Sequence, residues 1–215
     1  MPVTNMQELL KHELGDLLFA EKTILKALPK MAREVSNPEM RARMEEHVRE
    51  TQQQVTNLER AFAAIDERAK AEKCPAILGL VKEHDDFKKE ESPSKPILEA
   101  FDLGSGLRVE HYEIAAYTTA IAIARNLGLQ DVIDPLQENL EQELAMAEFI
   151  VRSAPTALEG ARANAEAVAA RTATKRGSAK KAAAKRAPAK KAAAKRGAAK
   201  KATAKRGTTK RAARR

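Results

Sequence analysis

The 215-residue chain divides by charge, because residues 171–215 contain 19 Lys and Arg and no acidic residue, whereas residues 1–170 contain 20 basic and 30 acidic residues. A single cysteine excludes an internal disulfide framework and fits a reducing cytoplasm. No long apolar run is present, so we expect neither a transmembrane helix nor a secretory signal peptide. The abundance of alanine, leucine, glutamate and lysine predicts an all-helical protein.

The N-terminal third is predicted to form two long antiparallel helices. Thr4 and Gln7 read as a capping box, and apolar residues then recur every three or four positions to about Val35. Ser36 begins a stop-and-restart signal, after which a second helix is predicted to run to about Lys70. The connection is so short that the two helices must form a hairpin.

The helical pattern weakens between Glu72 and Leu103, where prolines and a glycine interrupt it. A single short helix from Ala76 to about Lys89 fits this stretch. Such a long connection between two long helices predicts a crossover instead of a tight turn.

A second hairpin is predicted after the crossover. Its first helix runs from about Gly106 to Leu127, and its second is capped by Asp131 and ends at Ala154-Pro155. Two hairpins joined by one long crossover predict an all-α, ferritin-like four-helix bundle over residues 1–155.

The four predicted long helices all place metal-binding residue types on or beside their inner faces. Glu21 interrupts the apolar stripe of the first helix, where an isolated charge costs several kcal/mol or becomes protonated. At a rise of about 1.5 Å per residue, the candidates on all four helices lie near the middle of the bundle. The candidate metal ligands are Glu21, His47, Glu50, Glu110, Glu113 and Glu143.

Converging carboxylates repel one another and take up protons unless a cation lies between them. An oxygen-rich set with an imidazole suits iron or manganese, as one ion or a dinuclear pair, better than zinc. The alternative is a set of boundary residues with their charged groups in water, in which Glu50 and Glu113 pair with Arg or Lys. We expect His12, His84 and Cys74 to be surface or packing residues, and His111 to lie nearer the bundle edge.

Several segments resemble the YciE/YciF-type ferritin-like family of bacteria over about residues 5–152. They are Leu17–Lys22, Glu46–Thr51, Lys73–Leu80, Glu110–Tyr117 and Leu140–Glu143. The resemblance implies a four-helix bundle, usually dimeric, that is associated with the stress response and expected to bind metal. The wider ferritin-like group uses Glu-x-x-His on two helices, whereas this chain reads His47-x-x-Glu50 and Glu110-x-x-Glu113 and has no histidine on the fourth helix.

From Lys175 onward the chain repeats a basic decapeptide four times, and Gly177, Pro188, Gly197 and Gly207 interrupt it. No aromatic residue is interleaved, so base stacking is not indicated. Such a segment binds phosphates by counterion release without reading sequence, and it resembles the tails of linker histones. The predicted nucleic-acid contacts are Lys175, Arg176, Lys180, Lys181, Lys185, Arg186, Lys190, Lys191, Lys195, Arg196, Lys200, Lys201, Lys205, Arg206, Lys210, Arg211, Arg214 and Arg215.

We therefore predict three parts: the bundle at 1–155, a short alanine-rich helix at 156–170, and a disordered tail at 171–215. Anionic lipid and the acidic body are alternative targets of the tail, but four repeats without a hydrophobic anchor favour nucleic acid, with DNA as the predicted partner and RNA also possible. The prediction is a cytoplasmic, nucleoid-associated homodimer without membrane contact. By analogy with Dps-type proteins, it would sequester or oxidise iron, or remove peroxide, near DNA. The competing hypothesis is a metal-free dimer that bridges DNA segments through its tails.

Overall fold

A computed structural model describes the backbone of residues 3–204, and the side chains as far as Arg176 together with Ser178. Within these residues the protein is all-helical, with five helices and no strand. The helices are α1 (Met6–Glu34), α2 (Pro38–Ala63), α3 (Pro75–Glu90), α4 (Lys95–Asn126) and α5 (Gln130–Ala204). The chain separates into two compact units, Met1–Ala165 and Glu166–Arg215.

The first two helices begin at asparagine caps one residue after the predicted ones. The side chain of Asn5 accepts a hydrogen bond from the Glu8 amide at 2.9 Å, while the amide of Thr4 donates to the Glu8 carboxylate at 2.7 Å. Asn37 caps α2, and Pro38 occupies its first turn. The capping-box chemistry is therefore present, with its register shifted by one position.

Two other helix boundaries differ from the predicted ones. Helix α2 ends at Ala63 instead of Lys70, because the chain turns at Asp66, whose φ is 55°. Helix α4 begins at Lys95 instead of Gly106, with Ser94 as its N-cap residue and a proline in the first turn. The crossover is therefore made by an extended segment, the short helix α3 and the first turns of α4.

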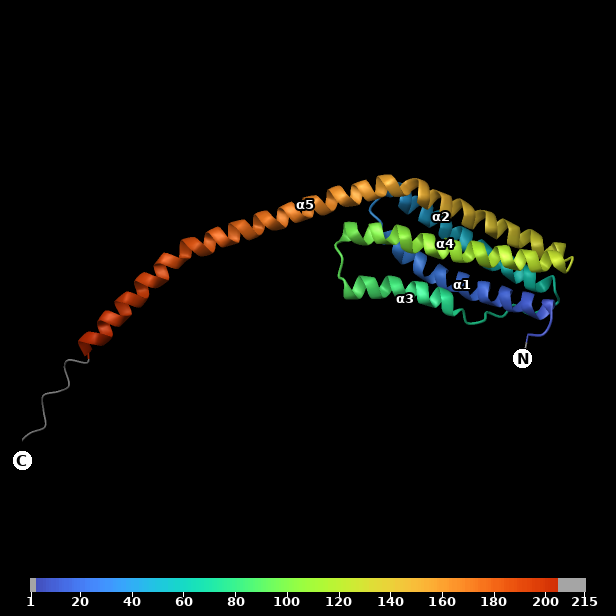
Figure 1. The fold of residues 1–215 in the computed structure, drawn as a ribbon, viewed down its shortest axis with the longest axis horizontal. Coiled ribbons are helices and arrows are strands. Elements are labelled where there is room, and N and C mark those ends of the chain that lie inside the picture. Colours follow the sequence, from blue (N-terminus) through green and yellow to red (C-terminus); the bar gives the residue numbers. More distant parts are fainter. Residues whose placement is uncertain (1–2, 205–215) are drawn as a thin grey trace, which may run out of the picture. The chain divides into compact units, whose positions relative to one another are not determined.

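The first unit places four helical segments side by side, as Figure 1 shows. Helices α1 and α2 form one antiparallel pair, and α4 with the first part of α5 forms another, with α3 alongside α1 and α4. The extended segment before α3 touches α1 directly, because the amide of Glu72 donates to the carbonyl of Gly15 at 2.9 Å. This arrangement brings the inner faces of α1, α2, α4 and α5 together.

Two apolar clusters fill the interior and lie on either side of a buried polar layer. In α1, Leu18 belongs to the first cluster and Ile24 to the second, and Glu21 lies between them. In α5, Leu136 and Met146 take the corresponding places. We call the residues between the clusters the polar layer: Glu21, His47, Thr51, Gln54, Asn57, Glu110, Glu113, Asn139 and Glu143, all of them buried.

Helix α5 does not end at Pro155 as predicted, and its backbone stays helical to Ala204. This differs from the separate helix that we predicted at 156–170 and, over residues 171–204, from the disorder that we predicted at 171–215. Alanine, lysine and arginine are strong helix formers, which accounts for helical backbone across the breakers in this stretch. Residues 205–215, which contain the last basic repeat, lie outside the described part.

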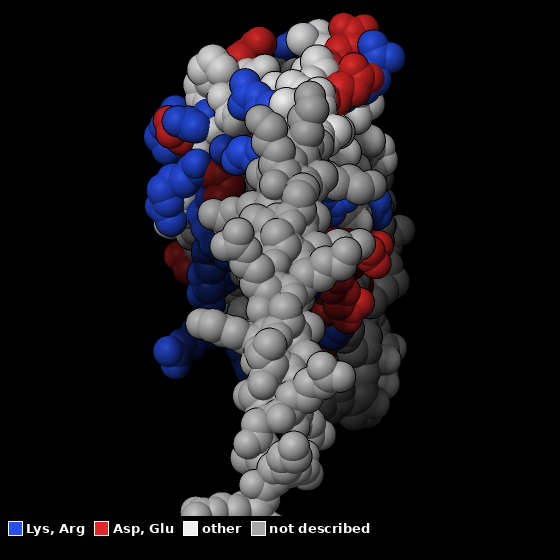
Figure 2. All heavy atoms as spheres, turned by 90° about the vertical axis from the view of Figure 1, so that its left-hand side faces the viewer, with Lys and Arg blue, Asp and Glu red and all other residues white. Residues whose placement is uncertain are grey.

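The first unit ends at Ala165, within residues 156–170, which we predicted as a short alanine-rich helix between the bundle and the tail. On the face shown in Figure 2, Lys and Arg gather mainly along one edge and Asp and Glu along the other.

No helix in residues 3–204 is both long enough and apolar enough to cross a lipid bilayer.

Candidate metal centre

The structure brings five of the six predicted ligands into the polar layer. Glu21 and Glu143 are fully inaccessible to solvent, His47 and Glu113 are 1% exposed, and Glu110 is 3% exposed. They come from all four long helices of the first unit, because each helix turns its inner stripe toward the same interior. Apolar clusters on both sides keep bulk water away from these groups.

The five residues form two groups that share Glu143. The potential ligand atoms of His47, Glu110 and Glu143 all lie within 4.8 Å of one another, and so do those of Glu21, Glu113 and Glu143. A carboxylate common to two such groups can bridge two cations. The arrangement therefore suits one ion in either group, or a pair of ions on the two sides of Glu143.

Each of the four glutamates has one buried oxygen without a hydrogen-bond partner in the described structure. These atoms are Glu21 Oε2, Glu110 Oε2, Glu113 Oε1 and Glu143 Oε2. A buried polar atom left unsatisfied costs about 1–3 kcal/mol, and more if it is charged. A cation in contact with these oxygens would satisfy them, and an oxygen-rich set with one imidazole fits iron or manganese. The residues present thus fit a metal ion.

Burial raises the pKa of Glu21, Glu110 and Glu113 well above the usual range of a glutamate, and neighbouring carboxylates add to the effect. Without a cation, these three side chains therefore favour the protonated form. A divalent cation competes with these protons, so that metal binding would release them.

Glu50 lies beside the centre and belongs to neither group. It accepts hydrogen bonds from Arg43 Nη1 at 2.7 Å and lies 3.2 Å from His47 Nδ1. Partial burial alone would raise the pKa of Glu50, but the bonds to His47 and Arg43 outweigh it and hold the pKa below its usual value. With Nδ1 held by Glu50, the other ring nitrogen of His47 faces Glu110, with 3.6 Å between Nε2 and Oε1. Glu50 is thus placed to orient the imidazole.

Two residues that the sequence reasoning missed each hold one carboxylate oxygen, on Glu21 and on Glu143. The hydroxyl of Tyr117 donates to Glu21 Oε1, and the side-chain amide of Gln54 donates to Glu143 Oε1. Tyr117 lies on the same helical stripe as Glu110, where a tyrosine reads as part of the apolar pattern. Gln54 has the helical spacing that places it one turn from Glu50, which is the signal that could have identified it.

A chain of hydrogen bonds links Tyr117 to the protein surface. Asn139 Nδ2 donates to the Tyr117 hydroxyl oxygen at 3.0 Å, and Asn57 Nδ2 donates to Asn139 Oδ1 at 2.8 Å. Asn57 Oδ1 in turn accepts from Arg60 at 3.1 Å. Because arginine can only donate, the direction of every bond in the chain is set. The Tyr117 hydroxyl hydrogen is therefore directed at Glu21.

The remaining histidines and the cysteine lie away from the polar layer, as expected. His111 is exposed, and its Nδ1 is 2.9 Å from the carbonyl oxygen of Leu107. His84 Nε2 is 2.9 Å from Asp102 Oδ1. Cys74 is buried at the start of α3, 3.0 Å from the hydroxyl of Tyr112, and burial raises the pKa of its thiol. His12 is exposed.

Comparison with known proteins finds relatives of the YciF type in both sequence and structure. The sequence is 31% identical to protein YciF of Escherichia coli K12 over 146 residues, which are 67% of this chain and 87% of YciF. The solved structure of the E. coli stress protein YciF matches with a TM-score of 0.68 and 28% identity, over 73% of this chain and 99% of that one. YcfI of Rhodopseudomonas palustris, described as a candidate structural protein, matches with a TM-score of 0.66 and 38% identity, over 69% of this chain and 94% of that one.

A protein from Xanthomonas campestris also matches, with a TM-score of 0.62 and 25% identity, over 75% of this chain and 99% of that one. These matches confirm the resemblance to YciF-type proteins. Residues 5–167 match the model of a domain of unknown function, DUF892, and the chain belongs to this family.

Proposed function

We propose that this DUF892 protein is a stress-associated metal-binding protein, in which a ferritin-like four-helix bundle holds one or two iron or manganese ions and a basic tail binds DNA. The observation that carries the metal assignment is the pair of buried groups that share Glu143, with an unsatisfied oxygen on each glutamate. The similarity to a protein described as a stress protein supports the physiological setting.

His47, Glu110 and Glu143 would hold one ion, and Glu21, Glu113 and Glu143 the other. Iron or manganese in such a site supplies redox chemistry toward peroxide or dioxygen. The chain's own contribution is to orient the ligands and keep the site dry: Tyr117 and Gln54 hold two oxygens, and the apolar clusters exclude water. Held in this way near DNA, iron would be kept from generating hydroxyl radicals there.

The DNA assignment rests on the tail sequence. The tail's 19 positive charges and absence of acidic residues favour phosphate contacts by counterion release, which does not distinguish DNA from RNA by sequence. Tethering would place the metal centre within reach of the nucleic acid.

A second candidate is a metal-free dimer that bridges DNA through two tails. It is favoured by the reversed order of His47 and Glu50, the lack of a histidine on α5 in the described structure, and the description of YcfI as structural. The two candidates differ in whether the polar layer takes up metal in stoichiometric amounts.

Metal content tests the proposal directly. Metal-free protein, prepared with a chelator, is titrated anaerobically with Fe²⁺ and separately with Mn²⁺, and bound metal is counted after gel filtration. We expect about one to two ions per chain and release of protons on binding, because the ligands must be deprotonated. Glu143→Gln removes the shared carboxylate, so both groups should lose affinity.

Glu141→Gln is the matched control, since Glu141 is exposed on the same helix two residues away. It should bind metal as the wild type does. If wild-type protein takes up no stoichiometric iron or manganese, or if Glu143→Gln binds as well as Glu141→Gln, the metal assignment is wrong and the bridging dimer is favoured.

A further inference from the structure

A cavity of about 300 Å³ lies next to the polar layer, between the end of α1, the start of α2, the first half of α4 and α5. It exists because small residues stand where large ones would fill the space: Gly106 on α4, and Ala157, Gly160 and Ala161 on α5. Its volume is at the lower end of the range of about 300–1,000 Å³ that ligand pockets occupy.

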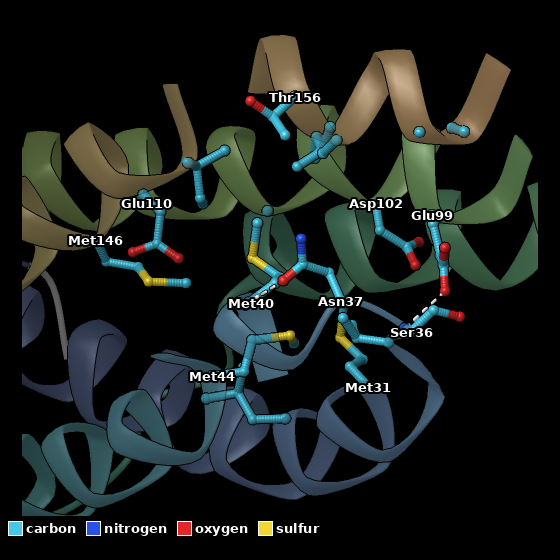
Figure 3. A pocket seen from close by; sticks show the side chains of 18 of the residues that line it. Met31, Ser36, Asn37, Met40, Met44, Glu99, Asp102, Glu110, Met146 and Thr156 are labelled. Carbon is cyan, nitrogen blue, oxygen red and sulfur yellow. Dashed lines mark hydrogen bonds between the residues drawn. The ribbon is translucent and has the colours of Figure 1, made fainter. Parts of the chain in front are cut away.

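The cavity wall is largely apolar and contains four methionines from three helices. Figure 3 shows Met31, Met40, Met44 and Met146 directed into the space. Methionine side chains are unbranched and polarizable, so they adapt to ligands of different shape. An apolar wall of this kind favours contact with the carbon chain of a ligand.

One end of the cavity is closed by a buried polar group. Glu110 lines the cavity, is 3% exposed, and has an oxygen, Oε2, without a hydrogen-bond partner in the described structure. A ligand with a terminal hydroxyl-type oxygen would satisfy this atom while its carbon chain lies against the methionines.

The charges around the cavity select against anions. Its ionisable lining residues in the described part of the chain are Glu99, Asp102 and Glu110, and no Lys, Arg or His lines it. Glu99 accepts a hydrogen bond from the Ser36 amide at 2.8 Å and Asp102 pairs with His84, so both acidic side chains are held in place. A carboxylate or phosphate end group would be repelled by Glu99 and Asp102, and beside Glu110 it would meet a buried acid with no cationic partner in the cavity wall.

We propose that this cavity is a binding site for an uncharged, medium-chain alkyl molecule that has a terminal hydroxyl or hydroperoxide directed at Glu110. Glu110 is also one of the candidate metal ligands, so the alkyl molecule and an ion in the His47 group would compete for its free oxygen. Binding is therefore tested on metal-free protein, where the proposal goes beyond the metal function and stands or falls separately from it.

The test uses full-length, metal-free protein and the neutral fluorescent probe N-phenyl-1-naphthylamine. The probe should gain fluorescence on binding, and 1-decanol should displace it. Decanoate has the same chain length but an anionic end, so it should compete at least about tenfold more weakly. Equal competition by decanoate, or no displacement by decanol, would overturn the proposal. Decyl hydroperoxide, compared with decanol, distinguishes the two neutral end groups.

Two alanine variants on α5 locate the binding site. Ala161 is buried and lines the cavity, so Ala161→Leu should fill part of it and weaken probe and decanol binding by about tenfold or more. Ala163→Leu, two residues along and exposed, should bind as the wild type does. Circular dichroism checks that both variants fold, and both should still take up metal. Unchanged binding by folded Ala161→Leu would place the ligand elsewhere and contradict the assignment. If that variant does not fold, Gly160→Leu takes its place, because a Cβ at Gly160 meets no atom within 4 Å.

Discussion

At the scale of single residues, the decisive feature is that each glutamate of the polar layer has one buried oxygen without a partner in the described structure, and that Glu21 and Glu143 each accept a hydrogen bond on the other oxygen. Glu21 illustrates this, since Oε1 accepts from Tyr117 while Oε2 has no partner in the described structure. The direction of the hydrogen-bond chain from Arg60 makes Tyr117 a donor to Glu21. In the proposed metal centre, Tyr117 would thus be a positioning residue that leaves one oxygen of Glu21 for a cation.

Tyr117→Phe should therefore weaken metal binding without removing any ligand. The variant leaves Glu21 Oε1 buried without a donor and lets the carboxylate rotate. Loss of such an outer contact typically lowers metal affinity by about 10–100-fold. Competition with a chromophoric chelator, using Mn²⁺ and the full-length protein, measures this dissociation constant.

Tyr112→Phe provides the matched control, because it makes the same change in the chain's other tyrosine. The Tyr112 hydroxyl donates to Asp16 and contacts Cys74, away from the polar layer. Its replacement should leave the metal dissociation constant within about twofold of the wild type. Equal affinities of the two variants would show that Tyr117 has no positioning role.

At the scale of helices, one close contact fixes where the crossover segment lies on α1. A Cβ added at Gly15 would come within 2.8 Å of Glu72 Cγ and 3.0 Å of the Lys70 carbonyl oxygen. The backbone oxygen cannot move freely, because the amide of Glu72 is hydrogen-bonded to Gly15 in the same segment. A glycine inside a helix therefore serves as a docking point for the connection.

Gly15→Ala and Gly79→Ala should consequently change stability in opposite directions. In an open helical position, alanine is favoured over glycine by about 1 kcal/mol. Gly79 is such a position, because a Cβ there meets no atom within 4 Å, so Gly79→Ala should raise the free energy of unfolding by about that amount. Gly15→Ala should lower it by about 1–3 kcal/mol, since overpacking displaces the crossover segment. Urea denaturation followed by circular dichroism measures both; a Gly15→Ala variant as stable as Gly79→Ala would contradict the docking role.

The helices and most of the site residues could be predicted from the sequence because both leave a periodic signal. Glu21 stands out as the charged member of an apolar stripe, and Glu143 repeats this in α5. The end of α2 could not be predicted in this way. Ile65 and Ala69 continue the apolar period beyond Ala63, yet they pack on the core from a non-helical segment.

The start of α4 and the role of Tyr117 escaped prediction for related reasons. The prolines before Leu103 read as interruptions, whereas in the structure Pro96 lies in the first turn of α4, which is helical from Lys95 through Gly106. Tyrosine counts as apolar in a periodic pattern, and only the three-dimensional contact with Glu21 reveals that its hydroxyl is used. A hydrogen bond between α4 and α1 leaves no trace in the spacing of either helix.

At the scale of the whole chain, all acidic residues lie within residues 1–170, and the proposed metal-binding and DNA-binding functions rest on different parts of the sequence. The residues that match the family end at 167, and the basic repeats begin after that point. The candidate metal centre and the cavity lie entirely within the first unit. Metal binding and DNA binding should therefore be separable by changes in the tail.

Ending the chain at Ala170 should abolish DNA binding while leaving metal uptake and the helical fold of the first unit unchanged. In the full-length protein, the logarithm of the DNA association constant should fall linearly with the logarithm of salt concentration, with a slope of about −0.9 per phosphate contacted. Fluorescence anisotropy with a labelled duplex at several salt concentrations measures both the loss of binding and the salt slope.

A full-length variant with the order of residues 171–215 scrambled keeps the charge and composition, so it should bind as the wild type does. Substantial binding by the truncated chain would place the DNA contacts in the first unit, and weak binding by the scrambled chain would mean that the decapeptide order itself is recognised.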